Sequence, residues 1–398
     1  MRYTILLSLL AVMLSSCDKE ISPVQAEKFV KYYGSYLMDE AGEVEVLDNG
    51  GFAICGTMNS SGSGKRMALI VTDKFGNMQS GFPLYYTEEG LETGASSMVA
   101  IQGGSGGFLL SGFVERPAGG SQSAQKDIFL VRTNASGEEL WQKSYGSSED
   151  EQILHSIERN GSGFLLAGSQ MKNGRSDLLV MGVTEMGDSI RIGLNYPNPN
   201  AQNSTANYLL STGRDYLCVS TVDKVNADGT DILILTFEDD LSPLIKKLSG
   251  EPIESGQCLV GEGSNRFLVL GNRVSTSGKM EMVIHSIEKD GLFITNTEQL
   301  ATISESNVDL IGKRMIKTAD GGYAIVGTRV EGGNSQIFLQ FFSSGYAVGE
   351  QVSFGASGVQ AGYDIDVGAD RGMVLLGTNS MGSSKVLSLI KTSETGDL

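Results

Sequence analysis

The chain has 398 residues, a formal net charge of −17, and 52 glycines against 7 prolines. Glycine is nearly twice its usual share of about 7%, and with no Gly-X-Y period a collagen-like chain is excluded. Hydrophobic residues make up 40% of the sequence, which is enough for a folded core and too much for a disordered chain. Only two histidines are present, which argues against histidine-rich metal sites, and the acidic balance argues against a nucleic-acid partner.

The N-terminus begins with Arg2 and an apolar run from Ile5 to Leu14, which is too short to span a bilayer as a helix. The run ends in Leu14-Ser15-Ser16-Cys17, which resembles the lipobox of bacterial lipoproteins. The resemblance implies a signal peptide over residues 1–16, lipidation of Cys17, and a polar tether over residues 17–27. An ordinary signal peptide with a chance cysteine is the alternative.

The residues after Cys17 are Asp18-Lys19-Glu20. Charged residues at this place resemble the surface-export signal of Bacteroidota lipoproteins. The resemblance implies a chain anchored by lipid to the outer membrane, and it favours the cell surface over the periplasmic face.

Residues 28–398 contain an internal repeat, in which a turn is followed by an aromatic-led apolar run and a small residue. One copy reads Gly50-Gly51-Phe52-Ala53-Ile54-Cys55-Gly56, and the small closing residues recur at intervals of 50 to 56 residues. They stand at positions 56, 112, 168, 220, 271, 327 and 377. The runs do not alternate with polar residues, so both faces of each strand are expected to be buried, as in a propeller blade between two neighbours.

A second apolar run follows each copy at hairpin spacing, for example Met67 to Thr72, and in six of the seven copies it reaches a turn glycine. These glycines are Gly76, Gly137, Gly187, Gly291, Gly345 and Gly396. The fourth copy departs from the pattern, with Ser220 in place of the closing glycine and Asp240 at the expected place of the turn glycine.

A third element, such as Trp141 to Gly146, comes after the turn glycine and has a surplus copy at Phe29 to Gly34. The last repeat lacks its own copy, so the N-terminal strand is predicted to complete the last blade and close the ring. The sequence therefore predicts an all-β, seven-bladed β-propeller with four-stranded blades. The core from Asp320 to Thr328 resembles the propeller repeats of secreted and lipoprotein Bacteroidota proteins.

Few residues suggest catalysis, since no Ser/His/Asp order, H-E-x-x-H or C-x-x-C motif occurs. His155 and His285 fall on strands and are interpreted as hydrogen-bonded structural side chains. Cys55, Cys218 and Cys258 are expected to be buried free thiols. The segments Asn226 to Asp231 and Gly103 to Gly107 are interpreted as turns rather than as calcium and phosphate loops.

Aromatic side chains are considered because sugar-binding propellers stack their ligands on them. The single tryptophan, Trp141, matches Phe29 in the repeat and is predicted to pack as part of the framework. Five tyrosines at the ends of outer strands are interpreted either as an aromatic rim or as ordinary residues of a half-exposed strand edge. They are Tyr32, Tyr33, Tyr85, Tyr86 and Tyr145.

The longest insertion carries Tyr196, Pro197, Asn198, Pro199 and Asn200, continues to Asn207, and is the candidate contact loop for a partner. We expect a non-catalytic protein without cofactor or metal, an accessory subunit of an outer-membrane complex for transport, secretion or assembly. One alternative is a surface glycan-binding lipoprotein. The other is a carboxylate-based glycan hydrolase or lyase, which requires acidic residues from several innermost strands to converge at the axis.

Overall fold

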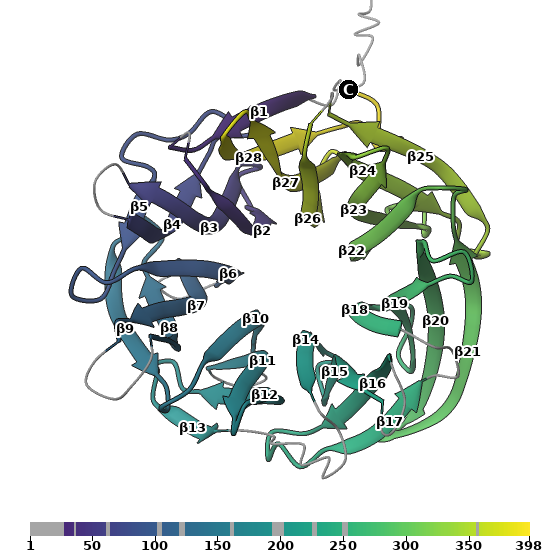
Figure 1. Cartoon of the computed structure of the whole chain (residues 1–398), viewed down its shortest axis with the longest axis horizontal. Helices are drawn as coiled ribbons and strands as arrows, with labels where there is room; N and C mark the ends of the chain where they lie inside the picture. Colours follow the sequence, from purple (N-terminus) through teal and green to yellow (C-terminus); the bar gives the residue numbers. More distant parts are fainter. Residues whose placement is uncertain are drawn as a thin grey trace, which may run out of the picture.

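The structure is a computed structural model that describes residues 28–35, 37–60, 64–101, 106–118, 124–159, 163–192, 203–224, 229–248, 254–355 and 358–398. Over these residues the chain forms 28 strands in seven four-stranded antiparallel sheets. The sheets stand as blades around a common axis (Figure 1). The predicted seven-bladed β-propeller is confirmed. Within the described ranges, no helix is long and apolar enough to cross a bilayer.

Each of the first six blades runs along the chain from an innermost strand to an outer strand. Blade 1 contains β2 (Glu40–Val46), β3 (Phe52–Ser60), β4 (Gly64–Val71) and β5 (Leu84–Tyr86). Blade 2 contains β6 (Thr93–Ala100), β7 (Phe108–Arg116), β8 (Gln125–Thr133) and β9 (Glu139–Tyr145). Blade 3 contains β10 (Glu151–Glu158), β11 (Phe164–Lys172), β12 (Arg175–Val183) and β13 (Ser189–Ile192).

The second half of the ring repeats this plan. Blade 4 contains β14 (Ser204–Ser211), β15 (Tyr216–Asp223), β16 (Thr230–Phe237) and β17 (Leu244–Leu248). Blade 5 contains β18 (Glu254–Gly261), β19 (Arg266–Val274), β20 (Met280–Asp290) and β21 (Phe293–Ile303). Blade 6 contains β22 (Asp309–Lys317), β23 (Tyr323–Glu331), β24 (Asn334–Phe342) and β25 (Val348–Phe354).

Blade 7 closes the ring with strands from both ends of the chain. It contains β26 (Gln360–Val367), β27 (Met373–Met381), β28 (Ser384–Lys391) and, as its outer strand, β1 (Phe29–Tyr33). β1 pairs antiparallel with β28, from Phe29 opposite Lys391 to Tyr33 opposite Leu387. Figure 1 shows β1 beside β28, next to blade 1. The predicted closure is confirmed, and it covers an edge that would otherwise offer unpaired backbone groups.

The core lies between the blades. The described buried residues form seven apolar clusters, and each cluster joins two neighbouring blades. In blade 1 the run from Phe52 to Cys55 is at most 1% exposed, because alternate side chains face blade 7 and blade 2. This explains why these strands lack a polar alternation.

The outer strand of a blade is linked to the turn that precedes the outer strand of the next blade. Tyr33, Tyr86 and Tyr145 donate hydrogen bonds from their hydroxyls to the carbonyls of Gly76, Gly137 and Gly187, each in the next blade. These glycines have φ angles of +70°, +80° and +75°, a region that side chains rarely adopt. The tyrosines therefore belong to the blade interfaces.

Asp240 and Gly345 lie in turns as predicted, but the left-handed residue of each turn comes one position later. In blade 4 the left-handed residue is Leu241 (φ +57°) rather than Asp240, and in blade 6 it is Tyr346 (φ +66°) rather than Gly345. In both turns this residue donates its amide to the carbonyl three residues before it, as Gly76 does to Asp73. Sequence alone favoured glycine there, whereas Leu241 is 2% exposed, so burial of its side chain offsets the backbone strain.

Candidate functional site at the propeller axis

The innermost strands share one irregularity that places a side chain at the axis. In six blades the innermost strand pairs with the next one through a register shift just before one residue, and that residue stands opposite the position preceding the closing residue of the repeat. In blade 1 the shift lies between Ala41 and Val44, and Glu43 within it is the corresponding residue. We call these seven residues the axial ring. They are Glu43, Ser97, His155, Tyr208, Cys258, Arg314 and Asp364.

Five members of the axial ring accept a hydrogen bond from a backbone amide of the following blade. Asp364 Oδ2 accepts from Val44, and Glu43 Oε2 accepts from Met98, at 2.8 and 2.9 Å. Three further acceptors follow the same rule: Ser97 Oγ from Ser156 at 2.9 Å, His155 Nδ1 from Leu209 at 3.1 Å, and Cys258 Sγ from Met315 at 3.1 Å. These bonds satisfy buried amides that the blades themselves leave unpaired.

Arg314 is the cation of the ring and lies between two carboxylates. Its Nη2 donates to Glu43 Oε1 at 2.7 Å, and its Nε lies 3.5 Å from Asp364 Oδ1. The guanidinium carbon stands 4.7 Å from the ring centroid of Tyr208, and Tyr208 stacks on His155 with centroids 3.9 Å apart. Side chains from five blades thus form one charged and aromatic cluster.

The protonation states follow from burial and from this cluster. Burial and then Arg314 lower the pKa of His155 well below its usual value, so the imidazole is neutral at pH 7. Burial disfavours the charged form of Arg314, but Glu43 and Asp364 outweigh it and raise its pKa. Burial and the charge of Glu43 raise the pKa of Asp364.

Two further carboxyl groups lie on β2 and β26, each two residues after a ring member: Glu45 after Glu43, and Asp366 after Asp364. Asp366 Oδ2 accepts from the amide of Val46 at 2.8 Å, and burial raises the pKa of Asp366. Burial, followed by the charges of Asp366, Glu43 and Asp364, raises the pKa of Glu45 from 4.5 to about 9. The acids of β2 and β26 therefore interact, as the hydrolase alternative requires.

These groups line a cavity of about 440 Å³, which we call the axial cavity. Its walls come from the innermost strands of blades 1, 2, 3, 4, 6 and 7. Five carboxyl residues line it against one arginine: Glu43, Glu45, Glu158, Asp364 and Asp366, with Arg314.

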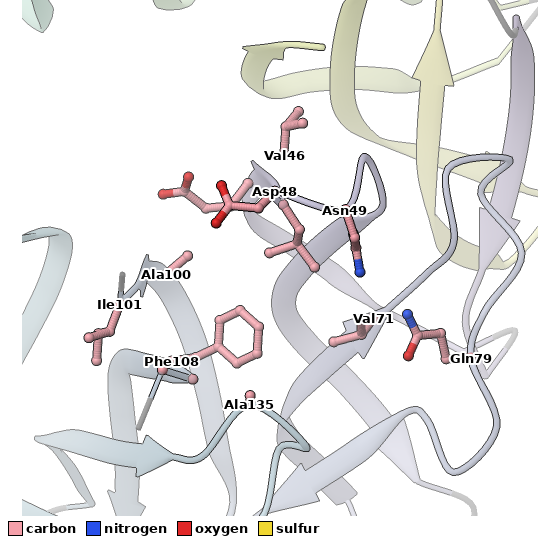
Figure 2. A pocket seen from close by; sticks show the side chains of 13 residues that line it. Val46, Asp48, Asn49, Val71, Gln79, Ala100, Ile101, Phe108 and Ala135 are labelled. Atoms are coloured by element: carbon pink, nitrogen blue, oxygen red, sulfur yellow. The ribbon is translucent and has the colours of Figure 1, made fainter. Parts of the chain in front are cut away.

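A second hollow of about 560 Å³, the blade 1–2 groove, lies beside the axial cavity and shares Glu45 and Ala100 with it. Figure 2 shows the Phe108 ring inside the groove, with Ile101 and Ala100 on one side and Val71 on the other. Asp48, Asn49 and Gln79 add polar groups at its border (Figure 2). The groove is therefore apolar at its base and polar at its rim.

Both hollows lie toward the face where the innermost strands end. Asp366 pairs with Val374, Val374 with Lys391, and Lys391 with Phe29, so Phe29 stands in the same row across blade 7. We call this the Phe29 face. The N-terminal end of the described chain and the two hollows thus share one face of the propeller.

The two histidines have different surroundings. His155 is hydrogen-bonded through Nδ1, and its Nε2 is 3.7 Å from Glu43 Oε1, which agrees with the structural interpretation. His285 on β20 is 8% exposed, but its Nε2 has no hydrogen-bond partner among the described residues. Burial and then Arg273 lower the pKa of His285 to about 4. The expected hydrogen bonding is therefore not found at this nitrogen.

The other sequence candidates are distributed around the ring. Trp141 is half-buried on β9 and donates from Nε1 to the Glu185 carbonyl at 3.0 Å, which supports a framework role. The five tyrosines belong to three outer strands, and only Tyr32 and Tyr85 are exposed, so they do not form one platform. Cys17 and the loop residues Tyr196, Pro197, Asn198, Pro199 and Asn200 lie outside the described residues.

The cysteines behave as predicted. Cys55, Cys218 and Cys258 are buried and free, and burial raises the pKa of Cys218 and Cys258 to about 12. Among the described residues, no group of three or more His, Cys, Asp or Glu side chains is arranged to hold a metal ion.

Sequence reasoning missed the charged cluster, because the repeat was aligned on its apolar second strands. The signal was a small residue two positions before the ring member in six of the seven blades, as in Gly312-Lys313-Arg314 and Gly362-Tyr363-Asp364. In blade 3 this position is Ile153. Aligning the innermost strands on this small residue would have brought Arg314 and Asp364 to equivalent positions.

Comparisons with known proteins identify the fold without a family. No protein-family model and no curated protein matches the chain. Among solved structures, a periplasmic gluconolactonase of Pseudomonas aeruginosa is 12% identical, with a TM-score of 0.52 over 86% of this chain and 96% of that one. The extracellular domains of Drosophila Semaphorin 1a are 10% identical, with a TM-score of 0.51 over 92% and 88% of the two chains.

A prolyl oligopeptidase from Galerina marginata is also 10% identical, with a TM-score of 0.52 over 91% of this chain. This chain spans about half of that enzyme, 49% of its length. Proteins with different names, a gluconolactonase, a semaphorin and a peptidase, thus have this architecture at similar TM-scores. At such identities the likeness shows a β-propeller and nothing about activity.

Proposed function

We propose that this chain is a non-catalytic, lipid-anchored propeller that serves as a protein-binding accessory subunit of an outer-membrane complex for transport, secretion or assembly. The N-terminal resemblance to a lipoprotein supports the anchor at Cys17, with surface display favoured by the residues that follow it. The position of Phe29 supports a disc whose Phe29 face is nearest to that anchor.

The observation that carries the proposal is that side chains of the axial ring accept hydrogen bonds from backbone amides of the neighbouring blade. A base needs a free lone pair within reach of its substrate, but His155 Nδ1 is taken by the Leu209 amide. The Ser97 and Ser156 hydroxyls are within hydrogen-bond distance of each other at 2.9 Å, and Glu43 and Asp364 each hold a backbone amide as well as Arg314. This bonding favours rigidity over reaction.

The test is affinity purification of the C-terminally tagged, natively lipidated chain from gently solubilised outer membranes, with mass spectrometry of the proteins that accompany it. A stoichiometric integral membrane partner is expected. The Cys17→Ala variant is the matched control, because it removes the acylated thiol and should lose the membrane partner. Recovery of the wild-type chain alone would contradict the proposal.

The candidate contact loop around Tyr196 to Asn200 provides a second arm of the same experiment. Its predicted extension to Asn207 is wrong, because Ser204–Ser211 forms β14 and Asn207 lies on that strand. The remaining segment, rich in proline and asparagine, lies in the chain between β13 and β14. Replacing residues 196–200 by a Gly/Ser linker is expected to weaken recovery of the partner.

A carboxylate-based glycan hydrolase is the second candidate, and one specific observation favours it. A general acid must hold its proton at working pH, and burial together with Asp366, Glu43 and Asp364 raises the pKa of Glu45 to about 9. Release of reducing sugar from a polysaccharide panel would support this candidate, provided that Glu45→Gln and Asp366→Asn abolish it. Glu350→Gln, on the exposed outer strand β25, is the control.

The glycan-binding alternative has less support. The exposed tyrosines Tyr32 and Tyr85 belong to outer strands of two blades. A glycan array with the purified chain tests it, and retention of a sugar would favour it over a protein partner.

A further inference from the structure

We propose that the axial cavity and the blade 1–2 groove together bind a segment of a partner protein in which a lysine or arginine stands beside a bulky apolar side chain. The basic side chain enters the axial cavity, and the apolar side chain lies over Phe108 in the groove. The inference rests on the proposed function, and it names the surface and the chemistry of the partner.

The first argument is the continuity of the two hollows. Glu45 and Ala100 line both of them, so a single extended segment can occupy the axial cavity and the groove without crossing a wall. The groove of about 560 Å³ and the cavity of about 440 Å³ also lie toward the same face. Hollows of this size are in the usual range for ligand sites in proteins.

The second argument is charge complementarity. Arg314 already has two anionic partners, Glu43 and Asp364. This leaves Glu45 and Asp366 as further carboxyl groups of the cavity, since the charge of Arg132 acts on Glu158. Arg314 is the one cation among the described residues that line the cavity. Glu45 holds its proton at pH 7, because burial and then the charges of Asp366, Glu43 and Asp364 raise its pKa, so a cationic side chain that enters the cavity would take the place of that proton. Opposite charges across an interface both attract and select, and this favours a positively charged ligand.

The third argument is the apolar base of the groove. Leu47, Val71 and Ile101 line it together with Phe108, and the loop residues Asp48 and Asn49 add polar groups. An apolar base with a polar rim is the usual arrangement of a contact that buries one hydrophobic anchor. Burial of a leucine side chain there adds its hydrophobic contribution to the electrostatic attraction next to it.

Hydrogen bonds between β2 and β26 explain why the site is ready to bind. Val46 and Val44 are fixed by Asp366 and Asp364, at 2.8 Å each, so β2 is held against β26 before any ligand arrives. A rigid site loses little conformational entropy when it binds.

The experiment measures binding of the full lipidated chain in detergent to an array of short peptides. The four peptide sets carry lysine beside leucine, glutamine beside leucine, lysine beside serine, and glutamate beside leucine. The lysine–leucine set is expected to bind at least about tenfold more tightly than each of the others.

Substitutions then assign the preference to the site. The double variant Glu45→Gln with Asp366→Asn should lose the preference for lysine over glutamine, while the asparagine introduced by the second substitution can still accept the Val46 amide through its side-chain oxygen. Leu47→Ser and Ile101→Ser should lose the preference for leucine over serine. Glu350→Gln on β25 is the matched control and should change neither preference. A thermal melt of each variant verifies its fold.

The outcomes separate the two proposals. Equal binding of all peptide sets, or a preference that survives the groove variants, overturns the inference even where a membrane partner co-purifies. Loss of that co-purification with intact peptide selectivity instead contradicts the accessory-subunit role and leaves the site in place. Retention of free alkylamines as tightly as the lysine–leucine peptides would also overturn the inference, because it would assign the site to small cations.

Discussion

Asp364 in the last blade accepts a hydrogen bond from the backbone amide of Val44 in the first, with Oδ2 and the amide nitrogen 2.8 Å apart. The two residues are 320 positions apart in the chain. The ring is therefore closed twice, once at the circumference by β1 on β28 and once at the axis by this carboxylate. The same side chain also faces Arg314, so closure and the charged cluster depend on one residue.

Removing this acceptor is expected to destabilise the propeller. Asp364→Ala leaves the Val44 amide buried without its partner and removes one anion beside Arg314, which should lower the free energy of unfolding by about 2–4 kcal/mol. Asp364→Asn keeps an acceptor oxygen, so its free energy of unfolding should fall by less. Urea unfolding followed by tyrosine and tryptophan fluorescence measures both. Equal stability of Asp364→Ala and the wild type would show that the axial bond contributes nothing to closure.

Arg314 offers a test of the charged cluster. Arg314→Met leaves Glu43 buried without its cation, and a loss of about 3–5 kcal/mol is expected, as for other buried ion pairs that lose one partner. A triple variant that adds Glu43→Gln and Asp364→Asn to Arg314→Met removes the unpaired charges. It should recover most of the stability that Arg314→Met loses. If the triple variant is no more stable than Arg314→Met, charge compensation is not the role of this arginine.

The raised pKa of Glu45 makes stability depend on pH. The folded state holds a proton on Glu45 up to about pH 9, whereas the unfolded state releases it near 4.5. Folding therefore binds a proton in this window, and stability falls as pH rises from about 4.5 to about 9. The raised pKa of Asp364 adds to this slope in the same direction, starting from its ordinary value of 3.8.

Glu45→Gln is expected to flatten this dependence and to melt at a higher temperature than the wild type at pH 8, with a gain of about 1–3 kcal/mol. Thermal melts at half-unit pH steps measure the slope. Glu350→Gln serves as the control and should follow the wild-type curve. A wild-type melting temperature that rises from mildly acidic to mildly alkaline pH would contradict the raised pKa.

The tyrosine contacts between outer strands and turns are expected to stabilise the ring in small steps. Tyr86→Phe removes the hydroxyl that donates to the Gly137 carbonyl at 2.6 Å and should lose about 0.5–1.5 kcal/mol. Tyr85→Phe changes the adjacent, exposed tyrosine and should stay within about 0.5 kcal/mol of the wild type. Equal effects of the two substitutions would rule out a role for the Tyr86 hydroxyl.

Gly137→Ala addresses the same contact from the other side. The φ angle of +80° disfavours a side chain, and an added Cβ would meet Leu84 of the preceding blade. A loss of about 1–3 kcal/mol is expected from the strain and the overlap. Gly174→Ala, with a φ angle of +73° and open space around it, separates the backbone strain from the contact. An equal loss in both variants would show that the overlap with Leu84 is relieved without cost.

Truncation tests the closure at the circumference. A chain that begins after Tyr33 lacks β1 and exposes the edge of β28, so it is expected to aggregate or associate through that edge. A chain that begins at residue 28 keeps β1 and should remain monodisperse in light scattering. Monodisperse behaviour of both chains would show that the edge of β28 needs no cover.

The amino-acid sequence determined the architecture because repetition is a local property of the chain. Seven apolar runs at regular intervals fix the number of blades, and the surplus strand at Phe29 fixes how the ring closes. The buried state of Cys55 and Cys218 also followed from the runs that contain them. The exceptions at Leu241 and Tyr346 escaped this reasoning, because tertiary packing held non-glycine residues in left-handed turns.

The site was decided by the tertiary structure alone. Glu43, Tyr208, Arg314 and Asp364 come from four blades, and they become neighbours only when the ring closes around its axis. The pattern of residues along each strand does not contain the distances between blades, so neither the ion pairs nor the shifted pKa of Glu45 could be inferred from it. Closure of the ring supplies the burial and the proximity of charge, and these two effects give the axial residues their chemistry.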